Sequence, residues 1–203
     1  MYNPPCGHLR KSSGTRNERW ENRHRFEHWY RDNSVYFITS STRDHFPAFA
    51  SEHAKQVFRD RFTHYANAHG FETWVVTLMN NHYHTLAYVA RADGLGEMMR
   101  KIHGSVAKLV NDLLPERRKP FWRERGGRDY FDGCLRDATQ LRRAHGYTVR
   151  QSVRHGVCAD WRAYGHTRVF VSAEEGVELA RARNAFLPEV PYARYQGKRG
   201  HAH

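Results

Sequence analysis

The chain has 203 residues, of which 39% are hydrophobic and 13% aromatic, enough for one compact domain with short extensions. It carries 33 Lys and Arg against 21 Asp and Glu, a formal net charge of +12 at neutral pH. Such an excess favours a polyanionic partner: nucleic acid first, and an anionic membrane surface second. The sequence has no run of about 18 apolar residues and no apolar signal core. We therefore expect no membrane-spanning segment and a cytoplasmic location.

Three cysteines, Cys6, Cys134 and Cys158, are odd in number and widely spaced, which argues against a disulfide framework. No Cys-x-x-Cys pair occurs, so a structural zinc finger is not expected. We interpret these cysteines as small buried hydrophobic residues.

The first half of the chain predicts a strand followed by a helix. Residues 1–30 are polar and basic, and two interpretations stay open: a solvated tail, or an arm that contacts nucleic acid. The segment 34–42 is rich in β-branched and aromatic residues, which is typical of a strand. A helix is predicted over 51–70, because Ser51 can cap its start, apolar residues recur at helical spacing, and Gly70 can end it.

The middle of the chain predicts a hairpin and a second helix. Strands are expected over 71–79 and 82–90, joined by two Asn at 80–81 in a tight turn. A helix over 94–115 has the clearest apolar stripe. The stripe comprises Leu95, Met98, Met99, Ile102, Val106, Leu109, Val110 and Leu113. A fourth strand is expected around 130–135.

The last part of the chain predicts two more helices. One starts at Asp137, which matches a capping box with Gln140, and runs to about residue 156. A short helix is expected near 173–186. The order up to the helix that starts at Asp137 is β-α-β-β-α-β-α.

This order is that of a ferredoxin-like, RRM-like α+β fold, in which one antiparallel sheet has helices on one face. A C-terminal helix is added to it. We expect a basic N-terminal arm over 1–30, a catalytic domain over 31–168, and a C-terminal tail with the short helix over 169–203. Such a sheet leaves its other face free.

A pair of histidines lies on the strand predicted at the centre of this sheet. His82 and His84 are two residues apart, so in a strand both side chains point to the same face. Imidazole is a common ligand of transition metals. A chain with 15 His also produces such a pair by chance, and from the pair alone this alternative stays open.

The predicted third helix carries side chains that suit phosphate chemistry. Tyr147 and Gln151 are four residues apart and share a helical face, and Arg143, Arg150 and Arg154 lie close to it. A tyrosine can form covalent intermediates, an amide oxygen can bind a metal, and arginines can bind phosphate. From the helix alone, a packing tyrosine and a solvated arginine face are the favoured interpretation, and only the histidine pair and the basic charge together with this helix favour phosphate chemistry.

Taken together, these segments resemble the HUH single-tyrosine transposases, and within them the REP-associated tyrosine transposases of bacteria. The family motif of His, a hydrophobic residue and His corresponds to "HYH" at 82–84. The family often has Pro at the positions held here by Asn80 and Ser152. Roughly residues 29–168 are covered. The matching segments are "VYFITSSTRDHFP" (35–47), "MMRKIHGSVAKLVN" (98–111) and "FWRERGGRDYFDGCLRDATQLRRAHGYTVRQSVRHGV" (121–157).

The resemblance implies a role for each matching residue. His82, His84 and Gln151 would bind a divalent metal, Mg²⁺ or Mn²⁺, and Tyr147 would be the nucleophile. The implied reaction nicks single-stranded or hairpin DNA, leaves a covalent 5′-phosphotyrosine and a free 3′-hydroxyl, and transfers the strand, as in DNA transposition. A free tyrosine hydroxyl has a pKa near ~10, so the metal and nearby arginines would have to activate it.

Basic and aromatic side chains are candidates for contacts with the DNA strand. These candidates are Arg143, Arg150, Arg154, Trp29 and Trp122, and either Trp could instead belong to the core. Two rival functions stay open: a non-enzymatic nucleic-acid-binding ferredoxin-like domain, and a replication-initiation or relaxase-type HUH nuclease. A domesticated transposase that cuts without moving itself also fits. A homodimer is compatible with the sequence, which does not show whether Tyr147 acts in its own chain or in a partner's.

Overall fold

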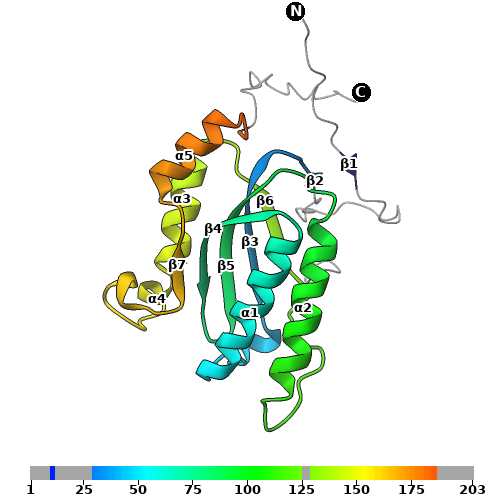
Figure 1. Cartoon of the computed structure of the whole chain (residues 1–203). Helices are drawn as coiled ribbons and strands as arrows, with labels where there is room; N and C mark the ends of the chain where they lie inside the picture. Colours follow the sequence, from blue (N-terminus) through cyan, green and yellow to red (C-terminus); the bar gives the residue numbers. More distant parts are fainter. Residues whose placement is uncertain (1–9, 12–28, 125–128, 187–203) are drawn as a thin grey trace, which may run out of the picture.

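The computed structural model describes residues 10–11, 29–124 and 129–186, and its fold is α+β (Figure 1). Five antiparallel strands form one sheet in the order β6-β3-β5-β4-β7. The strands are β3 (Ser34–Ser41), β4 (Phe71–Leu78), β5 (His82–Val89), β6 (Phe131–Cys134) and β7 (Thr167–Val169). A separate pair joins β1 (Arg10–Lys11) to β2 (Trp29–Tyr30). The expected antiparallel sheet is confirmed, with β5 at its centre.

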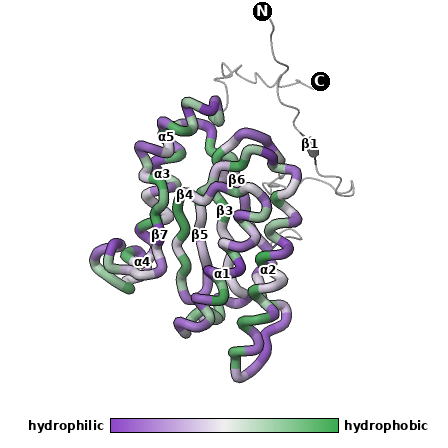
Figure 2. Tube along the Cα trace, in the orientation of Figure 1, coloured by the Kyte–Doolittle hydropathy of each residue, from purple (hydrophilic) through white to green (hydrophobic). Residues whose placement is uncertain are grey.

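Two long helices cover one face of the sheet, as expected (Figure 1). They are α1 (Glu52–Ala68) and α2 (Leu95–Asn111). Ser51 caps α1 by accepting a hydrogen bond from the Ala54 N–H, and Gly70 follows the helix with a positive φ of 65°. The core on this face includes Phe58, Tyr83 and Ile102, all within 1% of complete burial. Hydrophobic and hydrophilic residues alternate along α2 in Figure 2, as its position between core and solvent requires.

The face expected to be free is in fact covered by the C-terminal helices. α3 (Ala138–Val149) and α5 (Ala173–Ala182) pack on it through a second core that includes Trp74, Leu86, Leu141 and Val177. The sequence contains the physical reason, because β5 is apolar at both parities after its histidines and is therefore buried on both sides. Only the end of the sheet that carries the histidines faces the short helix α4 (Gln151–Arg154).

The helix expected to run from Asp137 to about 156 is divided in two. Asp137 accepts a hydrogen bond from the Gln140 N–H at 2.8 Å, so the predicted cap is confirmed. The helix stops at Arg150, whose φ of −89° and ψ of 10° separate α3 from α4. At this break the Gln151 side-chain amide donates to the Tyr147 carbonyl at 2.9 Å. In a continuous helix that carbonyl would accept the Gln151 backbone N–H instead.

Several smaller features differ from the sequence expectations. The short helix is α5, which ends earlier than expected, and β7 and two 3₁₀ turns, η1 (Arg43–His45) and η2 (Trp161–Ala163), were not foreseen. The domain boundary expected after residue 168 falls inside β7, and α5, which lies beyond that boundary, contacts α3. Leu109 and Leu113 were assigned to the apolar stripe of α2 but are 37% and 38% exposed, so the stripe is narrower. No helix in the described ranges is long and apolar enough to cross a membrane.

The contact between α5 and the sheet makes a testable prediction at Gly176. An added Cβ there would lie 3.1 Å from two ring carbons of Trp74, which is 1% exposed and cannot move easily. We expect Gly176→Ala to lower the unfolding free energy by about 1 kcal/mol, because overpacking outweighs the helix propensity of Ala. Urea denaturation measures this change.

Gly104→Ala in α2 is the matched control, because Gly104 is exposed and a Cβ added to it would have nothing within 4 Å. This variant should be neutral or stabilised by up to ~1 kcal/mol. Equal stabilisation of both variants would show that α5 does not pack tightly on Trp74.

Candidate active site

The two histidines of β5 lie side by side on the face that α3 and α4 approach. The ring centroids of His82 and His84 are 5.2 Å apart, with the planes at 76°. β5 is hydrogen-bonded on both sides, with His84 opposite Thr39 of β3 and Thr77 of β4. The expectation that both rings share one face is therefore confirmed, and the pairing on both sides holds them there.

Two amide side chains determine how His82 is oriented. The Asn81 NH₂ donates to the His45 carbonyl at 2.9 Å, so the Asn81 oxygen faces His82 and accepts from its Nδ1–H at 2.7 Å. The neutral ring then carries a lone pair on Nε2. The Gln151 NH₂ donates to the Tyr147 carbonyl, so the Gln151 oxygen faces that nitrogen at 3.4 Å.

This arrangement places two acceptor atoms opposite each other. The His82 Nε2 lone pair and the Gln151 Oε1 atom repel each other unless a proton or a cation lies between them. Burial lowers the pKa of His82 to about 4, the first cause being desolvation, with a smaller opposing contribution from Gln151. At neutral pH the ring is uncharged, so a metal cation fits between these two atoms better than a proton does.

His84 completes the same donor set. It is 6% exposed, and its Nδ1 is buried without a hydrogen-bond partner among the described residues. Burial, and after it the charge of the neighbouring His82, lowers the pKa of His84 to about 3. Two neutral imidazoles and one amide oxygen are a suitable ligand set for a divalent transition metal. Among the described residues, no three His, Cys, Asp or Glu side chains form a group that could hold an ion, and the oxygen that faces the histidine pair is Gln151 Oε1.

Tyr147 lies beside this donor set and is accessible to solvent. Its ring meets His84 edge-on at a centroid distance of 5.1 Å, and its side chain is the most exposed of the group at 39%. Phe37 of β3 supports both rings, stacked on His84 at 5.7 Å and edge-on to Tyr147 at 6.0 Å. The Arg154 guanidinium lies 4.9 Å from the centre of the Tyr147 ring. A cation over an aromatic face is attracted by the ring's electron density, so this contact holds Arg154 beside the exposed tyrosine.

The structure thus brings together His82, His84, Gln151 and Tyr147, and adds residues that sequence reasoning missed. Phe37 and Asn81 were missed, and so was His155, whose ring centroid lies 5.0 Å from that of His82. Phe37 could have been found from the pairing of β3 with β5. It lies opposite Leu86, which is two residues after His84 and on the same face of the strand. Asn81 precedes the predicted ligand His82, and His155 follows the predicted ligand Gln151 by four residues, but the sequence gave no sign of how either side chain is oriented.

The residues predicted to contact DNA differ in their exposure to solvent. Trp122 is 5% exposed, stacks on His103 and donates its indole N–H to the His103 carbonyl, so it belongs to the core and cannot stack on a base. Arg143 and Arg150 are exposed on α3 and at its end, and their DNA contacts stay a prediction. The side chain of Trp29 lies outside the described part of the chain.

Among known proteins, one solved structure is similar enough to this chain to inform about its fold. No family model matches the chain, and no curated protein matches it. A solved REP-associated tyrosine transposase, bound to a REP hairpin, is similar with a TM-score of 0.60 over 81% of this chain and 88% of that chain, at 14% sequence identity. The fold is that of a tyrosine transposase. A transposase candidate from Deinococcus radiodurans is similar over 60% of this chain and 88% of its own, at 15% identity and a TM-score of 0.42.

The low pKa values of the histidine pair predict how stability changes with pH. Both folded-state values lie below the ordinary ~6.5, so between about pH 3 and 6.5 the unfolded chain binds protons that the native protein does not. In the presence of EDTA, the unfolding free energy should fall by a few kcal/mol as the pH falls from 7 to 4, and should be fully retained above 6.5.

Urea denaturation at a series of pH values checks this, with two variants for comparison. His82→Gln/His84→Gln should show a shallower loss of stability toward low pH, because its titrating groups are gone. His53→Gln removes an exposed histidine of α1 and should keep the wild-type slope. Parallel curves for all three proteins would mean that the pair is not buried in its neutral form.

Proposed function

We propose that this protein is a metal-dependent enzyme that nicks single-stranded DNA and transfers the strand through a covalent 5′-phosphotyrosine on Tyr147. The observation that supports it is the meeting of four side chains from β5, α3 and α4. A neutral histidine pair and an inward-facing amide oxygen lie next to an exposed tyrosine. The tyrosine-transposase fold agrees with this assignment.

His82, His84 and Gln151 are the residues that would hold the metal. When bound, a divalent cation supplies a Lewis acid for a non-bridging phosphate oxygen and a template for in-line attack. Two imidazole nitrogens favour Mn²⁺ over Mg²⁺, which prefers a shell of oxygen ligands. The Asn81 hydrogen bond to His82 orients this ligand, as outer partners of metal-binding histidines commonly do.

Tyr147 is the proposed nucleophile. Its hydroxyl oxygen forms a bond to phosphorus while the bond between phosphorus and the 3′ oxygen breaks. The phenol proton is lost to solvent, and the departing 3′ oxygen takes up a proton to become a hydroxyl. Arg154 lies over the Tyr147 ring, and its guanidinium is suited to bind the charged phosphate beside that tyrosine.

The phosphotyrosine ester keeps the energy of the broken bond, so the step can be reversed on another end. A 3′-hydroxyl loses its proton to solvent as its oxygen attacks phosphorus, the bond between phosphorus and the Tyr147 oxygen breaks, and the phenolate is regenerated as a new phosphodiester forms. The tyrosine and the histidine pair meet within one chain, which supports action of Tyr147 on a phosphate held by its own subunit.

Hairpin DNA with a single-stranded extension is the proposed substrate. The net charge of +12 suits a polyanion, and the similar solved transposase is bound to a hairpin. A non-enzymatic binding domain would need neither the buried neutral histidine pair nor the exposed tyrosine beside it. A relaxase-type nuclease would use the same chemistry and differ in its DNA.

The nucleophile is tested by Tyr147→Phe and His82→Ala. We expect both to abolish cleavage, because one lacks the attacking oxygen and the other a ligand. Added Mn²⁺ should restore part of the activity of His82→Ala, and no metal should rescue Tyr147→Phe. The measurement is a denaturing gel of end-labelled hairpin DNA, taken from beside the gene, with and without Mn²⁺.

Both variants should still fold and bind DNA, since Tyr147→Phe removes one exposed oxygen. A protein-linked band that persists with Tyr147→Phe would assign the chemistry to another residue, such as Tyr130 or Tyr164. Binding by the wild type without any cleavage would favour the non-enzymatic class.

The charge of the protein makes a second prediction about binding. Each phosphate neutralised by Lys or Arg releases counterions, so affinity for single strands should fall steeply with salt, with a slope of about −0.7 per contact on a log–log plot. Fluorescence anisotropy with a hairpin carrying a single-stranded extension measures it. Tighter binding to a blunt duplex at the same salt would contradict the proposed substrate.

A further inference from the structure

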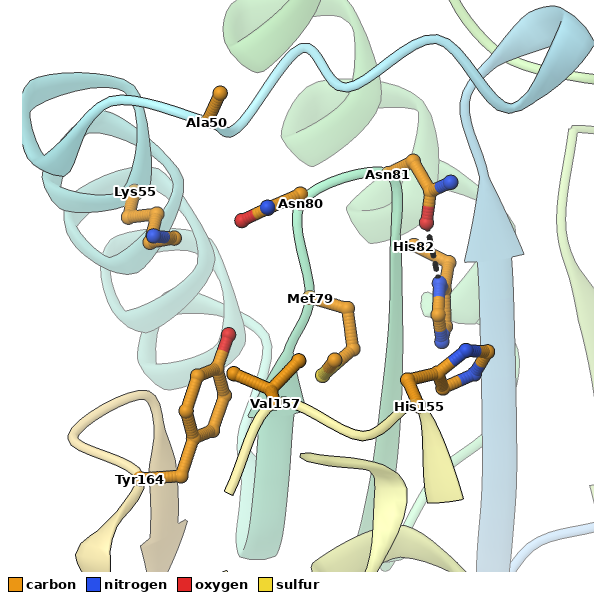
Figure 3. A pocket seen from close by; sticks show the side chains of 9 residues that line it. All are labelled: Ala50, Lys55, Met79, Asn80, Asn81, His82, His155, Val157 and Tyr164. Atoms are coloured by element: carbon orange, nitrogen blue, oxygen red, sulfur yellow. Dashed lines mark hydrogen bonds between the residues drawn. The ribbon is translucent and has the colours of Figure 1, made fainter. Parts of the chain in front are cut away.

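A cavity of about 310 Å³ opens beside the histidine pair, between α1, the turn from β4 to β5, and the chain after α4 (Figure 3). Its lining residues are Ala50, Lys55, Met79, Asn80, Asn81, His82, His155, Val157 and Tyr164. His82 belongs both to this cavity and to the candidate metal site. Whatever fills the cavity therefore lies directly next to the proposed position of the scissile phosphate.

The cavity carries positive charge without a carboxylate in its wall. None of its nine lining residues is Asp or Glu, and Lys55 enters it from α1 (Figure 3). The Lys55 side chain is only 8% exposed. A buried ammonium is costly unless it is paired and hydrogen-bonded.

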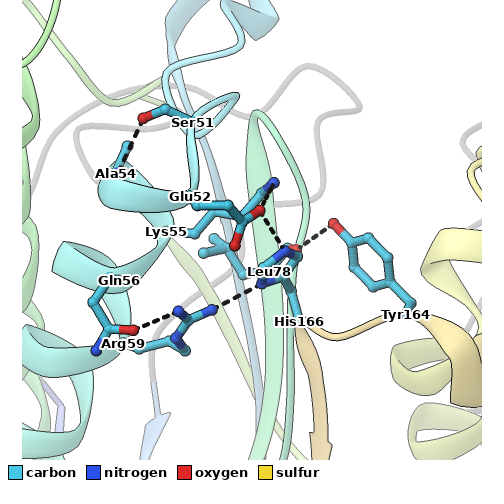
Figure 4. Close-up of polar contacts among 9 residues, drawn as sticks. All are labelled: Ser51, Glu52, Ala54, Lys55, Gln56, Arg59, Leu78, Tyr164 and His166. Carbon is cyan, nitrogen blue, oxygen red and sulfur yellow. Dashed lines mark hydrogen bonds and ion pairs between the residues drawn. The ribbon is translucent and has the colours of Figure 1, made fainter.

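The pairing that Lys55 has within the described part of the chain is incomplete. Its ammonium donates one hydrogen bond, to Glu52 Oε1 at 3.2 Å (Figure 4). The Glu52 side chain is 73% exposed, and the same oxygen lies 3.0 Å from His166 Nε2. An ammonium has three N–H donors, so Lys55 retains donors for an anion in the cavity.

The walls of the cavity are held in place before any ligand binds. The Arg59 guanidinium lies 2.8 Å from His166 Nδ1 and donates to Gln56, which ties α1 to the segment before β7. The Tyr164 hydroxyl donates to the Leu78 carbonyl at 2.9 Å (Figure 4). A site formed by fixed side chains loses less conformational entropy when it binds.

One more donor points toward the same space. The Asn80 amide lies at the turn between β4 and β5 and faces Lys55 across the cavity (Figure 3). Its side chain makes no hydrogen bond to the described residues, whereas that of Asn81 is used to orient His82. An amide NH₂ and an ammonium on opposite walls suit an anion with several oxygens.

We propose that this cavity binds a backbone phosphate of the DNA strand, the one adjacent to the phosphate that Tyr147 attacks, with the Lys55 ammonium as its main contact. The inference rests on the proposed function and names a residue that the reaction itself does not use. Its role is to fix the position of the strand relative to the histidine pair, so that the scissile phosphate meets Tyr147 in line.

The test compares Lys55→Gln with Lys108→Gln, which removes the same charge from an exposed position on α2. We expect Lys55→Gln to bind a hairpin with a single-stranded extension roughly 10-fold more weakly, because a charge-assisted hydrogen bond is lost. Its salt slope should fall by about 0.7, the value for one phosphate of a single strand. Lys108→Gln should change affinity by less than about 2-fold.

A DNA-side measurement supports this test without relying on any variant. Replacing single phosphates near the cleavage position, one at a time, by neutral methylphosphonates should weaken wild-type binding most at the phosphate next to the scissile one. The same replacement should have little further effect on Lys55→Gln, because both changes remove the same contact.

The outcomes separate this inference from the proposed function. If Lys55→Gln behaves like Lys108→Gln, or if the two changes are additive, the cavity does not bind a phosphate even where the covalent adduct forms normally. If the methylphosphonate pattern depends on Lys55 but neither protein forms an adduct, the inference holds and the proposed chemistry fails. Absence of any single-strand binding by the wild type overturns both.

Discussion

The position of the candidate site depends on the pleat of β5. Tyr83, between the two histidines, points to the opposite face, where it is fully buried and its hydroxyl lies 2.8 Å from His103 Nε2. His103 lies in turn 2.7 Å from a carboxylate oxygen of Asp129. Because neighbouring side chains of a strand point to opposite faces, anchoring Tyr83 in the core directs His82 and His84 toward α3 and α4. A slip of one residue would bury the imidazoles between the sheet and α1 and leave the site empty.

The break at Arg150 complements that strand from the other side. It frees the Tyr147 carbonyl to accept the Gln151 amide, and this single hydrogen bond sets which end of the amide faces His82. One side chain thus joins the backbone of the proposed nucleophile to the histidine pair. Local helix geometry, hydrogen bonding and the low pKa of the histidines all lead to one result: a gap between two acceptor atoms that suits a cation.

Much of the fold and of the candidate site could be predicted from the sequence, because periodicity determines which side chains share a face. The spacing of His82 and His84 correctly predicted that both rings share one face, and the cap at Asp137 is confirmed. Tyr147 and Gln151 both lie beside the histidine pair, but the single helix expected to carry them is interrupted at Arg150. The features that the sequence did not predict depend on contacts between segments far apart in the chain. The apolar residues of β5 indicate that both sheet faces are covered, but the local pattern does not show that α5 covers the second face or that Phe37 supports two rings.

The packing of α5 on α3 also determines when the site can form during synthesis. α5 is the last described helix to leave the ribosome, and its Val177 and Ala180 fill the core that holds Leu141 of α3. Domains tend to fold as units once their sequence has emerged. A nascent chain that ends before residue 173 can already pack α3 on β4 and β5, but Leu141 then lacks the cover of Val177 and Ala180, so α3 and its Tyr147 are held less firmly. With the proposed chemistry, a copy without α5 would therefore present its nucleophile less precisely to the histidine pair.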